Sequence, residues 1–301
     1  MAATPPQEQV KGIQPVKTEK KITVGVSLLA VDNVFISDIN SAMEAKAKEL
    51  GIRLIVSDGQ NSAEKQVSQV ENFIAQMVDV ILLNPKSMNG CKAAVESANR
   101  AGIPIITVNT LVENQDKCVT FVGSDAMESG RIQMEYVARL LNAKGNILIL
   151  RGQIGHDAEL GRRKGAQEIL DKNPGIQVTF EQSANWSRGE GFAIVENCLG
   201  SGKKIDVVVS QNDEMALGAV EAIRNSGLQG KIQVVGIDAI PEALRAIEDG
   251  SMAGTVFQDA KGQGAMAIQA AYKVAKGEKL ESRIYIPYVL VTRDDLPKYM
   301  N

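Results

Sequence analysis

Residues 22–58 read ITVGVSLLAVDNVFISDINSAMEAKAKELGIRLIVSD, and this stretch decides the fold. Residues 22–28 form an apolar, β-branched run that is typical of a buried strand. Residues 35–50 repeat apolar side chains at helical spacing up to Gly51, and residues 52–57 form a second apolar run. A strand, a helix and a strand in this order predict a βαβ unit, in which a helix lying on the sheet joins two parallel strands.

The same alternation continues along the chain and begins again near residue 121. Further strands are expected at 79–83, 105–108, 121–123, 146–150, 176–180, 206–209, 232–237, 255–257, 283–286 and 289–291, and further helices at 62–77, 90–101, 126–141, 160–170, 189–199, 214–225, 241–248 and 260–276. The simplest arrangement is an α/β fold with two doubly wound parallel-sheet lobes. A ligand of such a sheet lies beyond the carboxyl ends of the strands, so the residues after each strand are the informative ones.

Length and composition fit this arrangement and exclude several classes of protein. The chain has 301 residues, 44% of them hydrophobic and 23% charged, which is typical of a globular protein of about two domains. Its net charge of −3 offers no basic surface to a phosphate backbone, and its apolar runs are far shorter than the ~20 residues of a membrane span. We therefore expect no nucleic-acid partner and no membrane-spanning helix.

Signals of catalysis are missing from the sequence. A single histidine cannot form a histidine-based metal cluster, and neither a phosphate-binding P-loop nor a Gly-x-Ser-x-Gly elbow occurs. Residues 262–267 match Gly-x-Gly-x-x-Ala, but no βαβ unit follows them, so these small residues predict close helix packing rather than a dinucleotide site. We expect no catalytic residue, no metal and no cofactor, and a protein that is not an enzyme.

The cysteines and the N-terminal segment bear on the compartment without deciding it. Cys91, Cys118 and Cys198 are expected to be small core residues or free thiols, and a Cys91–Cys118 disulfide is the alternative if the protein is exported. Residues 1–20 are rich in Pro, Gln, Lys and Glu and lack the apolar stretch of a signal peptide. We expect a disordered tail, either on a cytoplasmic protein or on the mature part of an exported one.

The residues that follow the expected strands suit a polyol ligand. They are dense in Asn, Asp, Gln and Arg, and Phe35 and Trp186 add one aromatic side chain from each lobe. A sugar hydroxyl both donates and accepts hydrogen bonds, and the apolar C–H face of the ring can lie on an aromatic side chain. Structural alternatives stay open: Asp125 and Asp213 as helix caps, Trp186 as a core residue, His156 in a surface loop, and Arg162 on a solvated helix face with Arg163 and Lys164.

Three motifs are similar to those of a known family. QNDEMALGA at 211–219, VVGID at 234–238 and DGQN at 58–61 resemble stretches of the bacterial ribose-binding proteins, which are solute-binding proteins of ABC sugar importers. The resemblance extends from residue 22 to residue 292. It implies a periplasmic binding protein type I fold, in which a three-crossover hinge joins one lobe of residues 21–124 plus 259–286 to a second of residues 125–258 plus 287–301.

The resemblance also implies site residues, position by position. The expected ligand contacts are Ser27, Asn33, Phe35, Asn109, Arg162, Trp186, Asn212, Asp238 and Gln258, and His156 and Asp157 could serve the additional hydroxyls of a cyclitol. Asn109 and Thr110 stand where the family usually has Asp and Arg, which argues against ribose. Segments 181–186, 238–244, 257–264 and 286–292 resemble the inositol-binding branch. The expected ligand is myo-inositol, and ribose or another aldose or alditol is the alternative.

The same resemblance implies partners and a compartment. A solute-binding protein closes its lobes around the ligand, so we expect a sugar or cyclitol, the permease of an ABC transporter and a chemoreceptor as partners of a monomer in the periplasm or at the cell surface. The effector-binding domain of a sugar-responsive transcription regulator is an alternative of another class. Residues 1–21 are too short and too Pro-rich for its helix-turn-helix. An enzyme acting on a polyol is a third alternative, which no motif favours.

Overall fold

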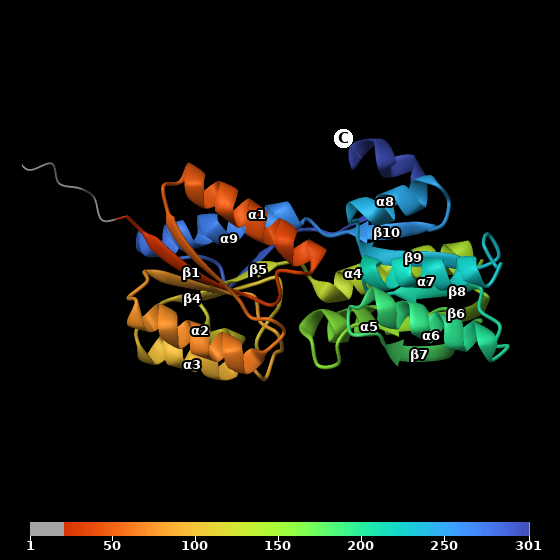
Figure 1. Ribbon diagram of the computed structural model, residues 1–301, viewed down its shortest axis with the longest axis horizontal. Helices are drawn as coiled ribbons and strands as arrows, with labels where there is room; N and C mark the ends of the chain where they lie inside the picture. The colour runs from red at the N-terminus through yellow and green to blue at the C-terminus, as the bar shows by residue number, and fades with distance from the viewer. Residues whose placement is uncertain (1–20, 301) are drawn as a thin grey trace, which may run out of the picture.

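Two α/β lobes lie along the long axis of the molecule in the computed structural model, which describes residues 21–300 (Figure 1). The tail expected at residues 1–20 lies outside the described residues. Each lobe contains one six-stranded sheet with helices on both faces. This is the expected fold class of two doubly wound α/β lobes.

The sheet of the first lobe is parallel throughout. Its strands are β1 (Thr23–Leu28), β2 (Arg53–Asp58), β3 (Val80–Leu83), β4 (Ile105–Val108), β5 (Phe121–Gly123) and β11 (Arg283–Tyr285), in the order β11-β5-β4-β3-β1-β2. In Figure 1, α1 (Val34–Glu49) and α9 (Ala260–Ala275) lie above the sheet, and α2 (Ala63–Ala75) and α3 (Lys92–Arg100) lie below it. Because both faces are covered, the central strand β3 is apolar throughout: Leu82 packs toward α1 and α9, and Leu83 toward α2 and α3.

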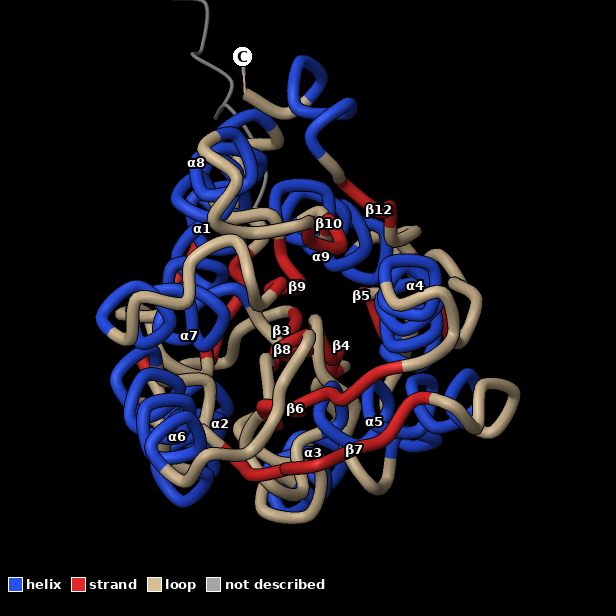
Figure 2. Tube along the Cα trace, turned by 90° about the vertical axis from the view of Figure 1, so that its right-hand side faces the viewer, coloured by secondary structure: helices blue, strands red, loops and turns tan. Residues whose placement is uncertain are grey.

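The second lobe repeats this plan with one antiparallel edge. Its strands are β6 (Gly145–Arg151), β7 (Ile176–Ser183), β8 (Val207–Ser210), β9 (Gln233–Asp238), β10 (Gly254–Phe257) and β12 (Val289–Val291), in the order β12-β10-β9-β8-β6-β7, and β12 runs antiparallel to β10. Figure 2 shows α4 (Ala126–Leu140) and α5 (Asp157–Leu170) on one face of this sheet, and α6 (Arg188–Gly200) and α7 (Asp213–Asn225) on the other. Helix α8 (Pro241–Glu248) shares the core of α6 and α7. Two 3-10 helices, η1 (Gln115–Lys117) and η2 (Arg293–Lys298), complete the described elements.

The chain passes from one sheet to the other three times. It leaves the first sheet after β5, returns to it between β10 and β11, and leaves it again between β11 and β12. Helix α9 packs on α1, so it belongs with the first lobe although it follows the second in the sequence. The expected lobe boundaries fall in these three connections, and the boundaries themselves stay a prediction.

Several helix and strand ends differ from expectation for identifiable reasons. Helix α5 begins at Asp157 instead of residue 160, because the His156 side chain caps it. The cap of α7 is Asn212, so the expectation that Asp213 caps this helix was wrong; Asp213 is its first residue and is fully buried. Strand β7 continues to Ser183 beyond a bulge. The expected cap Asp125 is confirmed, since its carboxylate accepts the Met127 N–H.

Two further expectations concern packing. A Cβ on Gly264 would lie 2.3 Å from the Ile39 carbonyl oxygen, which confirms the close approach of α9 to α1 expected from the small residues at 262–267. All three cysteines are free, Cys91 and Cys198 are buried and Cys118 is half-buried, so the alternative Cys91–Cys118 disulfide is not formed. Among residues 21–300, no helix has both the length and the apolar character needed to cross a membrane.

Candidate functional site

A cavity of about 420 Å³, including the space at its open mouth, lies between the two lobes. We call it the interlobe cavity. It lies at the carboxyl ends of the strands: Asn109 follows β4, Asp238 ends β9 and Gln258 follows β10. It is lined by Leu29, Asn33, Phe35, Ile36 and Asn109 of the first lobe and by His156, Ala158, Arg162, Trp186, Asn212, Asp238 and Gln258 of the second.

Each lobe contributes one aromatic side chain to this lining. Phe35 lies in the first turn of α1 and is 8% exposed, and Trp186 lies in the loop between β7 and α6. The Trp186 backbone has a φ of 66°, a conformation that side-chain-bearing residues rarely adopt. Its ring lies directly over Gly152, where a Cβ would be 1.9 Å from the ring atom Cη2. The position of Trp186 therefore depends on a glycine 34 residues earlier in the chain.

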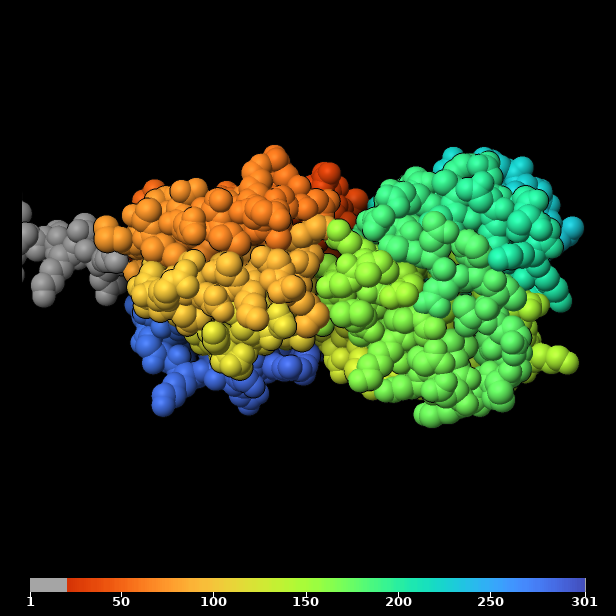
Figure 3. Space-filling view, turned by 90° about the horizontal axis from the view of Figure 1, so that it is seen from below, coloured from red at the N-terminus to blue at the C-terminus, as the bar shows by residue number. Residues whose placement is uncertain are grey.

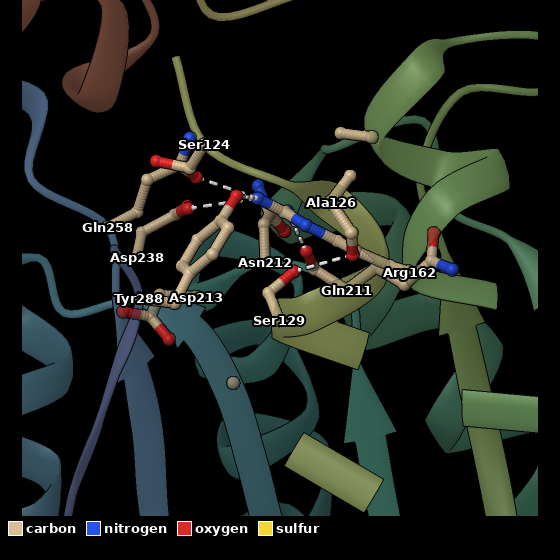
Figure 4. Close-up of polar contacts among 12 residues, drawn as sticks. Ser124, Ala126, Ser129, Arg162, Gln211, Asn212, Asp213, Asp238, Gln258 and Tyr288 are labelled. Carbon is tan, nitrogen blue, oxygen red and sulfur yellow. Dashed lines mark hydrogen bonds and ion pairs between the residues drawn. The ribbon is translucent and has the colours of Figure 1, made fainter. Parts of the chain in front are cut away.

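Arg162 is the centre of the polar side of the interlobe cavity. Figure 4 shows its guanidinium reaching toward Gln258, Asp238 and Tyr288. Nη2 donates to Gln258 Oε1 at 2.7 Å and lies 3.8 Å from Asp238 Oδ1, and Nη1 donates to the Gln211 carbonyl oxygen. Arg162 is only 4% exposed, yet its Nε–H has no hydrogen-bond partner among the described residues. This leaves one buried cationic donor available beside the cavity.

Two buried carboxyl groups lie on the same side. Asp238 faces the cavity from a backbone with φ 132°, and Ala239 after it has φ 61°. Asp213, behind this turn, accepts hydrogen bonds from the Thr255 hydroxyl at 2.7 Å and from the Ile240 N–H at 3.1 Å. Burial raises the pKa of Asp213 to about 6, and it raises the pKa of Asp238 well above its usual range although the Arg162 charge opposes this. Hydroxyl donors from a ligand would stabilise the charged form of Asp238.

Three helices begin at the interlobe cavity, and their caps line it. Asn33 Oδ1 accepts the Ile36 N–H at 3.1 Å, and Asn212 Oδ1 accepts the Met215 N–H at 3.0 Å. Asn33 and Asn212 thus cap their helices and line the interlobe cavity at the same time. Since the oxygens are engaged in capping, Asn33 Nδ2 remains to donate toward the cavity, and Asn212 Nδ2, which donates to the Trp186 carbonyl oxygen at 3.5 Å, keeps a second N–H for a ligand. His156 caps the third helix, α5, in the same way.

The lobes contact each other beside the interlobe cavity (Figure 3). The Thr110 hydroxyl lies 3.3 Å from His156 Nε2, and the Leu111 N–H donates to Asp157 Oδ2 at 3.3 Å. Lys86 Nζ hydrogen-bonds to Gln153 Oε1. Each of these contacts joins a loop of the first lobe to the loop or helix start after β6, so the two lobes form one enclosure.

Two predicted site residues lie away from the cavity lining. Ser27 is fully buried within β1 and donates its hydroxyl to Gln69 Oε1 at 2.7 Å, so it faces α2. Asp157 turns to the Leu111 N–H instead of the cavity. Three lining residues were missed: Leu29, Ile36 and Ala158. They directly follow β1 or lie in the first turns of α1 and α5, and counting those turns as part of each strand end would have found them.

Sequence and structure comparisons place these observations among known proteins. A family model described as "Periplasmic binding protein domain" matches residues 24–279. A putative rhizopine-binding protein of Rhizobium meliloti is 38% identical, covering 92% of each chain, and the ribose import binding protein of Bacillus subtilis is 36% identical, covering 91% of this chain and 88% of that one. A solute-binding protein from Bacillus halodurans, solved with bound myo-inositol, superposes with a TM-score of 0.91 at 41% identity, covering 95% and 99% of the two chains.

Proposed function

The chain belongs to the periplasmic binding protein family, and from this premise we propose that it is the solute-binding protein of an ABC importer that holds a sugar or cyclitol, myo-inositol first, in the interlobe cavity. The observation that best supports this proposal is the lining of the cavity, which combines an aromatic side chain from each lobe with carboxamides, a carboxylate and a buried guanidinium. A polyol ring has apolar faces and a rim of hydroxyls that donate and accept, which is the chemistry that this lining complements.

The preference for a cyclitol over ribose rests on Asn109 and Thr110. Asn109 lines the interlobe cavity with φ 65°, and its Nδ2 donates to Gln263 Oε1 at 3.2 Å. Thr110 is fully buried and turned to His156, so it adds no donor to the cavity. This side of the cavity is therefore neutral. Asn109 and Thr110 replace the Asp and Arg that ribose-binding relatives usually have at these two positions. The myo-inositol complex of the Bacillus halodurans protein agrees with this preference, and ribose remains the second candidate.

Lobe closure is the proposed mechanism of capture. The contacts of Thr110, Leu111 and Lys86 across the lobes exist only when the lobes are together. A ligand that touches both lobes binds the closed state more tightly and shifts the equilibrium toward it. The closed shape is the one that the permease of the importer, and a chemoreceptor as second partner, would recognise. The proposed role is binding without catalysis, by a monomer in the periplasm or at the cell surface.

The test is binding of purified protein that has been unfolded and refolded to remove carried-over ligand. Calorimetry and thermal shift are run with myo-inositol, with D-ribose and with D-sorbitol. A polyol present at 100 times its Kd should stabilise the folded protein by about 2.7 kcal/mol. A response to myo-inositol supports the proposal, a response to ribose alone keeps solute binding and rejects the cyclitol, and no response to any of the three contradicts the proposed ligand class.

A matched pair of variants locates the site. Asp238→Asn keeps the size of the side chain but removes the charged acceptor, and a hydrogen bond to a charged group is worth about 1.5–3 kcal/mol, so Kd should rise about 10- to 150-fold. Glu248→Gln makes the same chemical change at an exposed position of α8 and should leave Kd unchanged. Equal affinities of the two variants would place binding elsewhere.

A further inference from the structure

His156 is the only histidine of the chain, and both of its ring nitrogens are engaged in hydrogen bonds. Nδ1 accepts the Ala158 N–H at 3.2 Å, which caps α5 in the second lobe. Nε2 lies 3.3 Å from the hydroxyl of Thr110 in the first lobe. The ring is 4% exposed and packs edge-on against Trp186, with 5.4 Å between the ring centroids. His156 therefore touches the aromatic wall of the interlobe cavity, its own helix start and the opposite lobe.

These contacts determine which nitrogen carries the proton. A backbone N–H can only donate, so Nδ1 must accept and be unprotonated. The neutral ring then carries its proton on Nε2, and Nε2–H donates to the Thr110 oxygen across the lobes. A second proton would place an N–H on Nδ1 facing the Ala158 N–H, which breaks the cap. The closed arrangement accepts the neutral ring and excludes the imidazolium.

We propose that His156 is a positioning residue that latches the two lobes: its neutral ring caps α5 through Nδ1 and binds Thr110 through Nε2–H, and protonation of the ring releases the latch and weakens ligand binding. This inference rests on the function proposed above and adds to it a residue that holds the closed state. It also revises the expected role of His156, because a ring with both nitrogens engaged can offer the ligand only its apolar edge.

The charges around the His156 ring also favour its neutral form. Arg162 of α5 and Lys86 of the loop after β3 both disfavour a positive ring, as does the positive end of the α5 helix dipole. Among the nearby carboxylates, Asp157 is turned to the Leu111 N–H, and Glu159 is paired with Arg151. Burial, together with Arg162 and Lys86, lowers the pKa of His156 to about 3. Opening takes Lys86 and Thr110 away and lets water reach the ring, whereas Arg162 and the α5 cap stay beside it, so the pKa in the open protein should rise toward the ordinary value of about 6.5 without reaching it.

The direction of the pH effect follows from these two states. Between the closed-state and open-state pKa values the open protein binds more protons, so acid favours opening. The contribution of His156 to affinity should be constant above pH ~7 and should fall below it by at most tenfold per pH unit, which by itself makes Kd at pH 5.5 up to about tenfold higher than at pH 7.5. Losing the Thr110 hydrogen bond alone should raise Kd about 2- to 10-fold.

The direct test is NMR of the single histidine in the full chain, with ¹⁵N-labelled imidazole, without ligand and with saturating myo-inositol. We expect a ring that titrates near pH 6 in the ligand-free protein. In the loaded protein we expect a ring that stays neutral to pH 5, with the proton on Nε2. The same titration pH in both states, or a proton on Nδ1 in the loaded protein, overturns the latch. If neither myo-inositol nor D-ribose binds at pH 7.5, the proposed function fails, and this inference fails with it.

The pH dependence of Kd in four variants distinguishes the His156 latch from other contacts between the lobes. His156→Asn keeps a capping side chain but loses both the titration and the reach to Thr110, so its Kd should rise less between pH 7.5 and 5.5 than that of the wild type. Thr110→Val should weaken binding at both pH values, and Thr110→Ser, which keeps the hydroxyl, should bind more tightly than Thr110→Val. Gln153→Ala removes a different side-chain contact across the lobes, the one with Lys86, and should change affinity without altering its pH dependence. A wild-type pH profile in His156→Asn overturns the proposal.

Discussion

Gly152→Ala tests how the ligand-facing aromatic of the second lobe is positioned. Gly152 follows β6, and a Cβ there would lie 1.9, 2.1 and 2.2 Å from three atoms of the Trp186 ring. Ordinary contacts begin at 3.4 Å, so the ring would have to move by about 1.5 Å. Gly152 itself cannot retreat, because its N–H donates to Gln211 and its carbonyl accepts the Ser183 hydroxyl.

Displacement of the Trp186 ring should weaken ligand binding more than it lowers the stability of the fold. The Trp186 backbone is held at φ 66°, so the ring must move, and the open space next to it is the interlobe cavity. Overpacking of this kind costs roughly 1–3 kcal/mol. If the closed, ligand-bound state carries that cost, Kd should rise about 5- to 150-fold. The unfolding temperature of the ligand-free protein should change little.

Calorimetry with myo-inositol gives Kd, and fluorescence reports the ring directly because Trp186 is the only tryptophan. Gly200→Ala is the matched control: it lies at the end of α6 in the same lobe, and a Cβ there meets nothing within 4 Å. We expect unchanged binding in the control and weaker binding with an altered fluorescence response in Gly152→Ala. An unchanged Kd in Gly152→Ala would refute the reasoning that Trp186 forms a wall for the ligand.

Three other changes probe the second lobe. Arg162→Lys cannot reach Gln258 and the Gln211 carbonyl together. A hydrogen bond to a charged group is worth about 1.5–3 kcal/mol, so calorimetry should find Kd about 10- to 150-fold higher, and an unchanged Kd would contradict this. The raised pKa of Asp213 means that the wild-type protein loses stability as the pH rises from about 4 to 6, and Asp213→Asn removes this effect. The unfolding temperature of the wild type should therefore increase relative to that of the variant as the pH falls from 7 to 4.5. A difference that stays constant with pH would contradict this. Gly165→Ala would place a Cβ 2.1 Å from the Met127 carbonyl oxygen, and chemical denaturation should show a loss of about 1–3 kcal/mol; unchanged stability would show that α4 and α5 can separate.

Much of the candidate site was visible in the sequence because it lies at strand ends. Asn109, Asp238 and Gln258 each end or follow a strand, and parallel strands end at one edge of a sheet. The same rule is too coarse for Ser27 and Asp157, because alternate residues of a strand face opposite sides and a helix start can turn its side chain away. Ser27 consequently faces Gln69, and Asp157 faces the other lobe.

The order of strands and helices is determined by the sequence alone, since the two periodicities of apolar residues are local properties of the chain. Helix ends were less certain where the cap is unusual, as at His156, whose imidazole replaces the usual hydroxyl or carboxylate. The motif at 211–219 placed Asn212 at the site but could not show that the same side chain caps α7.

Only the tertiary structure decided which distant residues meet around the cavity. The ring of Trp186 rests on Gly152, the guanidinium of Arg162 joins Gln258, and the hydroxyl of Thr110 meets the ring of His156, over separations of 34, 96 and 46 residues. No local pattern encodes such pairs. The first two depend on how strands and helices pack within the second lobe, and the third depends on how three chain crossings bring the two lobes together. The sequence determined two lobes and the polar character of the cavity between them, and the packing within and between the lobes determined the geometry of its contacts.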